Sequence, residues 1–142
     1  MTTSTTIKAL AQALTPRMSP YIRVVPHPKQ QAFMWLPMRE AFFGGSAGSG
    51  KTAALFMCAL QYVDVPGYAA LILRRTFPDL QKAGGLIPLS HEWLGPTNAV
   101  WSEQRHSWRF PSGAVLDFGY LEHENDIYQY QGSEYQTICY DE

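Results

Sequence analysis

The sequence has little net charge and no long apolar run, and each shortage excludes a class of protein. Its 142 residues carry 11 Lys and Arg against 12 Asp and Glu, for a formal net charge of −1. The overall charge therefore predicts no strong attraction to nucleic acid or to a membrane surface. A local basic patch is still compatible with this net charge if acidic residues elsewhere balance it. No apolar stretch approaches the roughly 20 residues that a membrane-spanning helix needs. The N-terminus has no signal-peptide pattern, so we expect no membrane association.

Cysteine and histidine are also scarce and show no pattern of a disulfide framework or a metal site. The two cysteines fall in a predicted helix (Cys58) and a predicted buried strand (Cys139), which is typical of core residues in a protein from a reducing compartment. The four histidines are scattered without the spacing of metal ligands, at His27, His91, His106 and His123. The 46% hydrophobic content predicts one globular domain with a core.

What the sequence does contain is a phosphate-binding loop. Residues 45–52 read Gly-Ser-Ala-Gly-Ser-Gly-Lys-Thr and match the P-loop pattern G-x-x-x-x-G-K-[ST] at every position. Residues 41–44 before the loop are predicted to form a short buried strand, and residues 53–62 after it a helix. In such a loop the glycines let the backbone turn its N–H groups towards phosphate oxygens at a helix N-terminus.

This pattern predicts a role for each residue of the loop. Lys51 would place its positive charge on the β- and γ-phosphates, and the Thr52 hydroxyl would bind Mg²⁺. The backbone of six residues would surround the phosphates: Gly45, Ser46, Ala47, Gly48, Ser49 and Gly50. The loop therefore predicts binding of a nucleoside triphosphate with Mg²⁺. The alternative is a Gly/Ser-rich turn that precedes a helix by chance.

A second pattern stands at the end of the sequence. Residues 136–140 are predicted to form an apolar strand, and Asp141 and Glu142 follow it, which is the Walker B pattern. Ligands bind at the carboxyl ends of strands in open α/β sheets, so Asp141 can hold the same Mg²⁺ as Thr52, directly or through water. Glu142 would polarise the attacking water as general base. The alternative is a strand with a solvated acidic end.

The segment before the loop offers a contact with the nucleotide base. Residues 28–38 are predicted to form a helix with Gln30 and Phe33 on one face. A glutamine amide can both donate to and accept from adenine, and the arrangement resembles the Q motif of helicase-like motors. We prefer Gln30 to Gln31 because Phe33 follows Gln30 by three positions. The alternative is two solvated glutamines on an amphipathic helix.

The remaining sequence alternates between patterns typical of strands and of helices. The apolar run at 68–75 ends in Arg74 and Arg75 and predicts a buried parallel strand. Residues 99–121 are rich in aromatic side chains and contain Pro-Ser-Gly at 111–113, which predicts a β-hairpin. The other expected elements are a short helix capped by Thr76, one or two helical turns at 89–94 and a helix at 122–130.

Five stretches together resemble the large subunit of the bacteriophage terminase, the genome-packaging motor. They cover roughly residues 21–142 and read PHPKQQAF, FFGGSAGSGKT, LILRRTFPDL, WRFPSGAVLDFGYLE and YQGSEYQTICYDE. The P-loop is common to many ATPases. The order of the stretches, and the hairpin that leads through Tyr130-Gln131-Gly132 to the acidic pair, is similar to terminase in particular.

The resemblance implies an α/β fold of the P-loop NTPase type, in the ASCE or RecA-like class. We expect a three-layer αβα core, a mostly parallel sheet with a β-hairpin insertion, and truncation at the C-terminal side. Residues 1–20 would be a flexible N-terminal segment, and residues 21–142 the N-terminal portion of the ATPase domain, ending at the Walker B pattern. The nuclease domain of the family would be absent, so we expect a fragment or a truncated reading frame.

The resemblance also implies a function: ATP hydrolysis that powers translocation of viral double-stranded DNA into the procapsid, in the host cytoplasm. Lys51 and Glu142 would be catalytic. The implied partners are the DNA, the portal protein, the small terminase subunit and further copies of the full-length protein in a ring. Many family members carry an arginine just before the glycine that is Gly132 here, whereas this sequence has Gln131. Arg74 and Arg75 are then the candidate arginine fingers, with surface charge as the alternative.

Two other functions stay open at this point. One is a helicase-type ATPase that tracks along nucleic acid, and the other is a nucleotide-binding remnant that binds ATP without turnover. We expect the 142-residue chain alone to hydrolyse ATP slowly or not at all, because an arginine finger contributes about 10³–10⁵ in rate in related enzymes. Measured turnover compared with measured binding separates the motor from the remnant.

Overall fold

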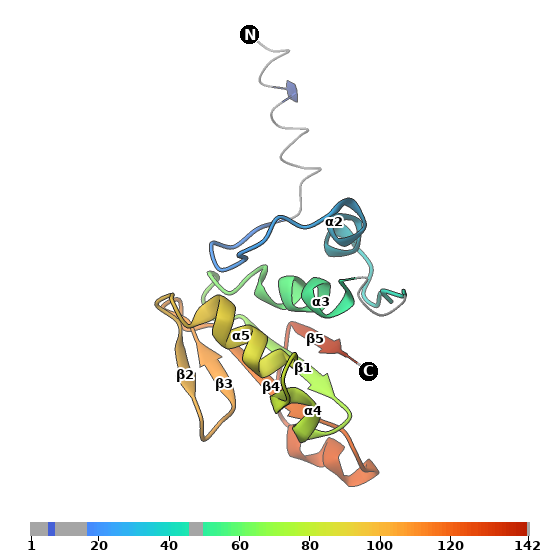
Figure 1. Ribbon diagram of the computed structural model, residues 1–142, viewed down its shortest axis with the longest axis vertical. Helices are drawn as coiled ribbons and strands as arrows, with labels where there is room; N and C mark the ends of the chain where they lie inside the picture. Colours follow the sequence, from blue (N-terminus) through green and yellow to red (C-terminus); the bar gives the residue numbers. More distant parts are fainter. Residues whose placement is uncertain (1–5, 8–16, 46–49, 142) are drawn as a thin grey trace.

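A mixed five-stranded sheet organises the part of the chain that the computed structural model describes, namely residues 6–7, 17–45 and 50–141 (Figure 1). The strand order is β2-β3-β4-β1-β5. The two pairs that β1 forms, with β4 and with β5, are parallel, whereas β2 with β3 and β3 with β4 are antiparallel. The strand bounds are Ala69–Arg74 (β1), Val100–Ser102 (β2), Ser107–Arg109 (β3), Val115–Tyr120 (β4) and Thr137–Tyr140 (β5).

Four α-helices and one 3₁₀-helix complete the described elements. Their bounds are Pro28–Trp35 (α2), Lys51–Leu60 (α3), Phe77–Gln81 (α4), Leu86–Leu94 (α5) and Glu124–Tyr130 (η1, the 3₁₀-helix). Local signals explain where the short helices begin. The His27 side chain accepts from the backbone N–H of the third residue of α2, and the Thr76 side chain accepts from the backbone of α4, so both are N-caps.

The core lies between one face of the sheet and the helices α3, α4 and α5. Ile72 of β1 and Phe56 of α3 are fully buried, and the Phe56 ring lies 5.0 Å from the Trp93 ring of α5 between centroids. The indole N–H of Trp108 donates to the Ser90 hydroxyl at 2.9 Å, which satisfies a polar group inside the core. Figure 1 shows α4 and α5 in front of the strands, with α3 beside β5 and α2 beyond it.

The opposite face of the sheet carries η1 and the loop after it. The Tyr135 hydroxyl donates to Asp117 at 2.7 Å, and the Tyr130 hydroxyl accepts from the backbone N–H of Tyr120 at 3.0 Å. Gly119 makes this approach possible, because a Cβ there would collide with the Tyr130 hydroxyl. The described residues therefore form an α/β domain with a mixed sheet and its α-helices on one face, and they do not show the predicted three-layer core.

One predicted element is wrong. Residues 41–44 form no strand, and the side chain of Phe42 is 92% exposed. The reason is the position of the segment: β5 is the edge strand of the sheet, and a groove of about 880 Å³ is lined by residues of both β5 and the 41–45 segment. A strand needs a neighbour for its ladder of hydrogen bonds, and this segment pairs with none of the described strands; the described partner of β5 is β1.

The other predicted elements exist, with changes of boundary and kind. The parallel strand, the helix after the loop and the last strand are confirmed within two residues of their expected bounds. The 99–121 region contains three strands instead of two, because the chain also turns at 103–106 between β2 and β3. The expected helix at 122–130 is a 3₁₀-helix, and residues 89–94 lie in the longer α5.

The predicted flexible segment at 1–20 is described only at residues 6–7 and 17–20. There, Arg17 forms an ion pair with Asp64 at 2.8 Å, and Ser19 is buried. Within the described ranges, no helix is both long and apolar enough to cross a membrane.

Candidate functional site

The described part of the predicted P-loop consists of Gly45 and residues 50–52, while Ser46, Ala47, Gly48 and Ser49 lie outside the described residues. Gly50 has a φ of 82°, a left-handed conformation that favours glycine, and α3 begins directly after it. The Lys51 ammonium donates to the carbonyl oxygen of Gly45 at 2.9 Å. The lysine side chain therefore spans the loop between its first glycine and the start of α3.

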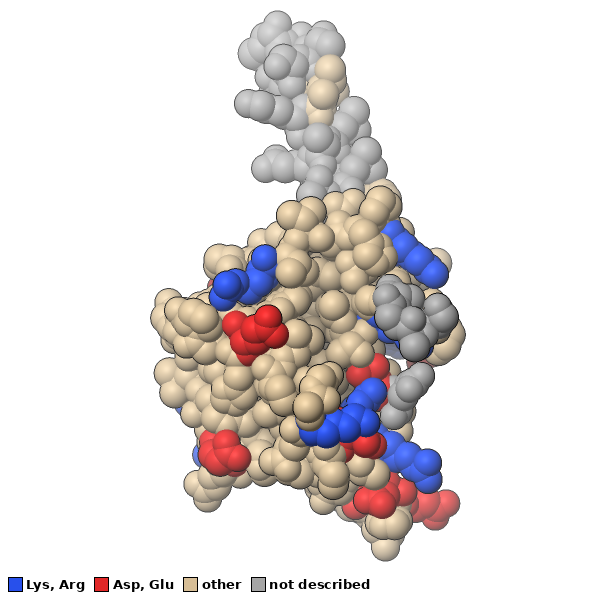
Figure 2. All heavy atoms as spheres, in the orientation of Figure 1, with Lys and Arg blue, Asp and Glu red and all other residues tan. Residues whose placement is uncertain are grey.

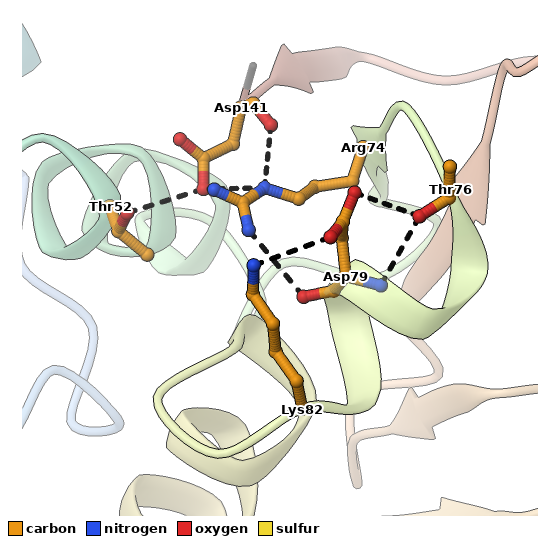
Figure 3. A network of polar contacts seen from close by, with 6 residues as sticks. All are labelled: Thr52, Arg74, Thr76, Asp79, Lys82 and Asp141. Atoms are coloured by element: carbon orange, nitrogen blue, oxygen red, sulfur yellow. Dashed lines mark hydrogen bonds and ion pairs between the residues drawn. The ribbon is translucent and has the colours of Figure 1, made fainter.

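Thr52 and Asp141 are brought together although 89 residues separate them in the sequence. The Thr52 hydroxyl, in the first turn of α3, donates to Asp141 Oδ2 at 3.2 Å (Figure 3). Asp141 directly follows the carboxyl end of β5 and is 5% exposed. The hydroxyl and the carboxylate predicted to share one metal ion therefore face each other.

Arg74 is the third member of this cluster. It ends β1, the strand beside β5, and its Nε donates to the backbone carbonyl of Asp141 at 2.8 Å. The same Nε lies 3.4 Å from Asp141 Oδ2, an ion pair whose two side chains are 17% and 7% exposed. Arg75, the other predicted candidate, is exposed. Of the two arginines, the structure thus places Arg74 in the site.

The start of α4 holds the Arg74 guanidinium from the other side. Arg74 Nη1 donates to the Asp79 carbonyl at 3.4 Å, and the Asp79 carboxylate accepts from the Thr76 hydroxyl at 2.7 Å and from Lys82 at 3.3 Å (Figure 3). The hydrogen bond from Thr76, followed by that from Lys82, lowers the pKa of Asp79 below its usual value. The capped turn thereby presents its carbonyl to the arginine.

Gln30 lies against the end of the loop, on the helix that precedes it. Its amide Nε2 donates to the carbonyl oxygen of Gly50 at 3.0 Å, and its Oε1 accepts from the backbone N–H of His27 at 3.0 Å. Gln30 is 5% exposed, whereas Gln31 is exposed. The Phe33 ring packs edge-to-face on Phe43 at 5.2 Å between centroids.

The groove of about 880 Å³ opens beside this cluster. Lys51 and Asp141 line it together with Phe33, Phe43 and Leu55, so its wall combines charged and apolar side chains. A second cavity of about 820 Å³ lies on the other face of the sheet, where its lining includes Asp117 and Tyr135. Of the predicted site residues that the structure describes, none lines that cavity.

Sequence reasoning missed the contacts that position the site. His27 precedes a proline and a helix, which is an N-cap signal that could have been recognised. The bond from Gln30 to the Gly50 carbonyl and the bond from Arg74 to the Asp141 carbonyl had no signal, because each depends on long-range packing. Glu142, the predicted general base, lies outside the described residues.

The chain matches a known family. The family model described as "Terminase large subunit, T4likevirus-type, N-terminal" matches residues 42–142, which include the P-loop pattern, Arg74 and Asp141. Neither a curated protein nor a solved structure matched the chain. The match covers well over half of the sequence and confirms the resemblance on which the expected packing role rests. The chain therefore belongs to the T4-like type of terminase large subunit, as the N-terminal region of such a subunit.

Proposed function

We propose that this chain binds Mg²⁺-ATP and hydrolyses it to drive viral double-stranded DNA into a procapsid. The observation that carries the proposal is the 3.2 Å contact between the Thr52 hydroxyl and Asp141 Oδ2. These two groups come from the loop pattern and from the end of β5, and a metal-nucleotide site needs both in one place. Membership of the terminase family supports the packaging role.

The start of α3 would hold the phosphates. A helix N-terminus offers unpaired backbone N–H groups and a positive dipole end to an anion, and α3 begins at Lys51. The Lys51 ammonium hydrogen-bonds a neutral carbonyl, that of Gly45. A phosphate oxygen is a stronger partner for an ammonium group than a carbonyl is, so Lys51 would turn from Gly45 to the phosphates.

The metal-binding residues fit Mg²⁺ in kind and number. Mg²⁺ prefers oxygen ligands and is usually held by one or two carboxylates, substrate phosphates and several waters. Thr52 supplies a hydroxyl and Asp141 a carboxylate, and Asp141 also lines the groove. In the described ranges no cluster of three or more His, Cys, Asp or Glu could hold a metal. Phosphate oxygens and waters would supply the remaining ligands. When bound, the metal would neutralise phosphate charge.

Turnover would depend on Glu142 and Arg74. Glu142 follows Asp141 directly and would orient the attacking water as general base. Arg74 is already held beside Asp141, so a change of rotamer would let its guanidinium approach transferred phosphate and stabilise the charge that develops there. Arg75 is exposed and is the weaker candidate for an arginine finger.

The DNA, the portal protein, the small terminase subunit and a ring of like subunits are the partners that this function requires. Figure 2 shows basic and acidic side chains interspersed over the described part of one face. This pattern agrees with the formal net charge of −1, and it predicts that the region alone holds DNA weakly. The site of action would be the host cytoplasm, where procapsids are filled.

Calorimetric titration with Mg²⁺-ATP tests the proposal. Lys51→Ala is expected to weaken binding by tenfold or more, because it removes the charged phosphate partner. Ser49→Ala, at a variable position of the same loop, is the matched control and should change affinity less than twofold. Equal affinities for the two variants would contradict the assignment of the phosphate-binding loop.

The Mg²⁺ dependence of ATP affinity tests the metal site separately. Asp141→Asn is expected to abolish the gain in ATP affinity that Mg²⁺ produces, while leaving metal-free ATP binding nearly unchanged. Phosphate release then separates the motor from a remnant that binds without turnover: a wild-type protein that binds Mg²⁺-ATP and releases no phosphate, even with DNA and portal protein added, would reject hydrolysis.

A further inference from the structure

Both ends of the Gln30 amide are already used inside the protein. Nε2 donates to the Gly50 carbonyl oxygen at 3.0 Å, and Oε1 accepts from the His27 backbone N–H at 3.0 Å. The residue is 5% exposed, so the second N–H and the second lone pair of the amide have little access to a ligand. A glutamine that reads a base needs a donor and an acceptor presented side by side to that base, and Gln30 presents them to the backbone.

The backbone that Gln30 holds is the turn where the P-loop becomes α3. The Gly50 carbonyl accepts from the Ala54 backbone N–H at 2.9 Å, the first bond of the helix, and it accepts from Gln30 as well. Gly50 is the N-cap of α3, and it has no side chain that could cap the helix. Gln30 is therefore the side chain that fixes the orientation of this peptide from outside the loop.

The packing around Gly50 is tight on the same side. A Cβ at Gly50 would lie 2.6 Å from Gln30 Nε2 and 3.2 Å from His27 Nε2. The first turn of α2 thus touches the glycine directly, and the capping box that joins His27 to Gln30 holds both side chains in place. The first turn of α2 and the first turn of α3 are therefore held together at Gly50.

We propose that Gln30 is a positioning residue for the phosphate-binding turn and does not select the nucleotide base. By holding the Gly50 carbonyl, it aims the first N–H groups of α3 and the adjacent Lys51 at the phosphates. Phosphate binding depends on the direction of these groups. This inference rests on the proposed function, in which the loop binds a triphosphate, and it replaces the base contact predicted for Gln30 from the sequence.

The test compares ligands with and without a base. Wild-type protein and variants are titrated calorimetrically with Mg²⁺ complexes of ATP, GTP and inorganic tripolyphosphate. Gln30→Ala removes the whole amide. Gln30→Glu keeps the shape and the acceptor for His27 but loses the donor to Gly50, and it stays informative if the alanine variant fails to fold. Gln31→Ala is the matched control on the exposed side of the same helix.

We expect Gln30→Ala and Gln30→Glu each to weaken the binding of all three ligands by one common factor, about five- to tenfold, because both variants lose the hydrogen bond to the Gly50 carbonyl. Gln31→Ala should leave all three affinities unchanged. Thermal unfolding of the free proteins is measured alongside, because a loss of affinity in a variant that is still folded at the titration temperature comes from the site itself.

Two results would overturn the inference while leaving the proposed function intact: a loss confined to ATP, which would make Gln30 a base reader, or no loss for any ligand in either variant. A wild-type protein that binds neither ATP nor tripolyphosphate would instead overturn the proposed function, and this inference with it. The wild-type titration therefore distinguishes the two failures.

Discussion

Loss of Arg74 should destabilise the free protein because it leaves the buried Asp141 carboxylate without its cationic partner. The ion-pair distance is 3.4 Å, with side chains 17% and 7% exposed. At an effective dielectric constant of about 20, the Coulomb attraction at this distance is at most roughly 5 kcal/mol. Removing one partner of a buried pair typically costs about 3–5 kcal/mol. Because Thr52 still donates to the carboxylate, we expect Arg74→Ala to lower the free energy of unfolding by about 2–3 kcal/mol.

Urea unfolding at pH 7, followed by circular dichroism, measures this change. A double-mutant cycle with Asp141→Asn isolates the charge pair, because the bond from Arg74 Nε to the Asp141 backbone carbonyl survives in the asparagine variant. The coupling energy should be about 1–3 kcal/mol. Arg75→Ala, at the exposed neighbouring position, is the control and should change stability by less than about 0.5 kcal/mol. Additive effects of Arg74→Ala and Asp141→Asn would refute the reasoning.

Two further predictions concern the surroundings of the site. Gly119→Ala should lower the free energy of unfolding by about 1–3 kcal/mol, because the new Cβ collides with the Tyr130 hydroxyl; urea unfolding measures the loss, and Tyr130→Ala in the same chain should remove most of the additional effect. The pKa of Asp79 is lowered, and the hydrogen bond from Thr76 is the largest cause. Its carboxylate therefore stabilises the fold above the unfolded-state pKa of about 3.9. This contribution disappears as the pH falls through the lower folded-state pKa. The stability difference between wild type and Asp79→Asn should accordingly be constant above about pH 5 and shrink below pH 4; a difference that does not change with pH would contradict this.

Sequence patterns predicted the local elements well where one periodicity dominated. The apolar run that becomes β1 is buried at Leu71 and Ile72, because a strand that is covered on both faces of the sheet needs apolar residues at successive positions. The capping pattern at Thr76 and Asp79 correctly located the start of α4, since a cap depends only on residues three positions apart. Such signals are contained within a few residues and need no knowledge of the rest of the fold.

The remaining features depend on contacts between distant segments. Residues 41–44 have the composition of a buried strand, but whether they form one depends on pairing with a neighbouring strand, and Phe42 is exposed instead. The two ends of the Gln30 amide could face a base or a backbone equally well on sequence grounds; the packing of α2 on α3 decides between them. The meeting of Thr52 with Asp141 was predictable only because both belong to recognised patterns.

The two cysteines at the contact between α3 and β5 can report how often that contact opens. Cys139 Sγ lies 3.7 Å from the Leu55 carbonyl, and burial raises the pKa of both Cys58 and Cys139 to about 12. At pH 8 only about one thiol in 10⁴ is then ionised, and the thiolate is the form that reacts. Because Cys139 is buried, we expect its modification by a thiol reagent to need separation of α3 from β5, so that the rate at Cys139 reports how often this contact opens. Thr52 lies in the first turn of α3, and β5 leads to Asp141. A ligand that binds both Thr52 and Asp141 should therefore lower the rate of thiol modification.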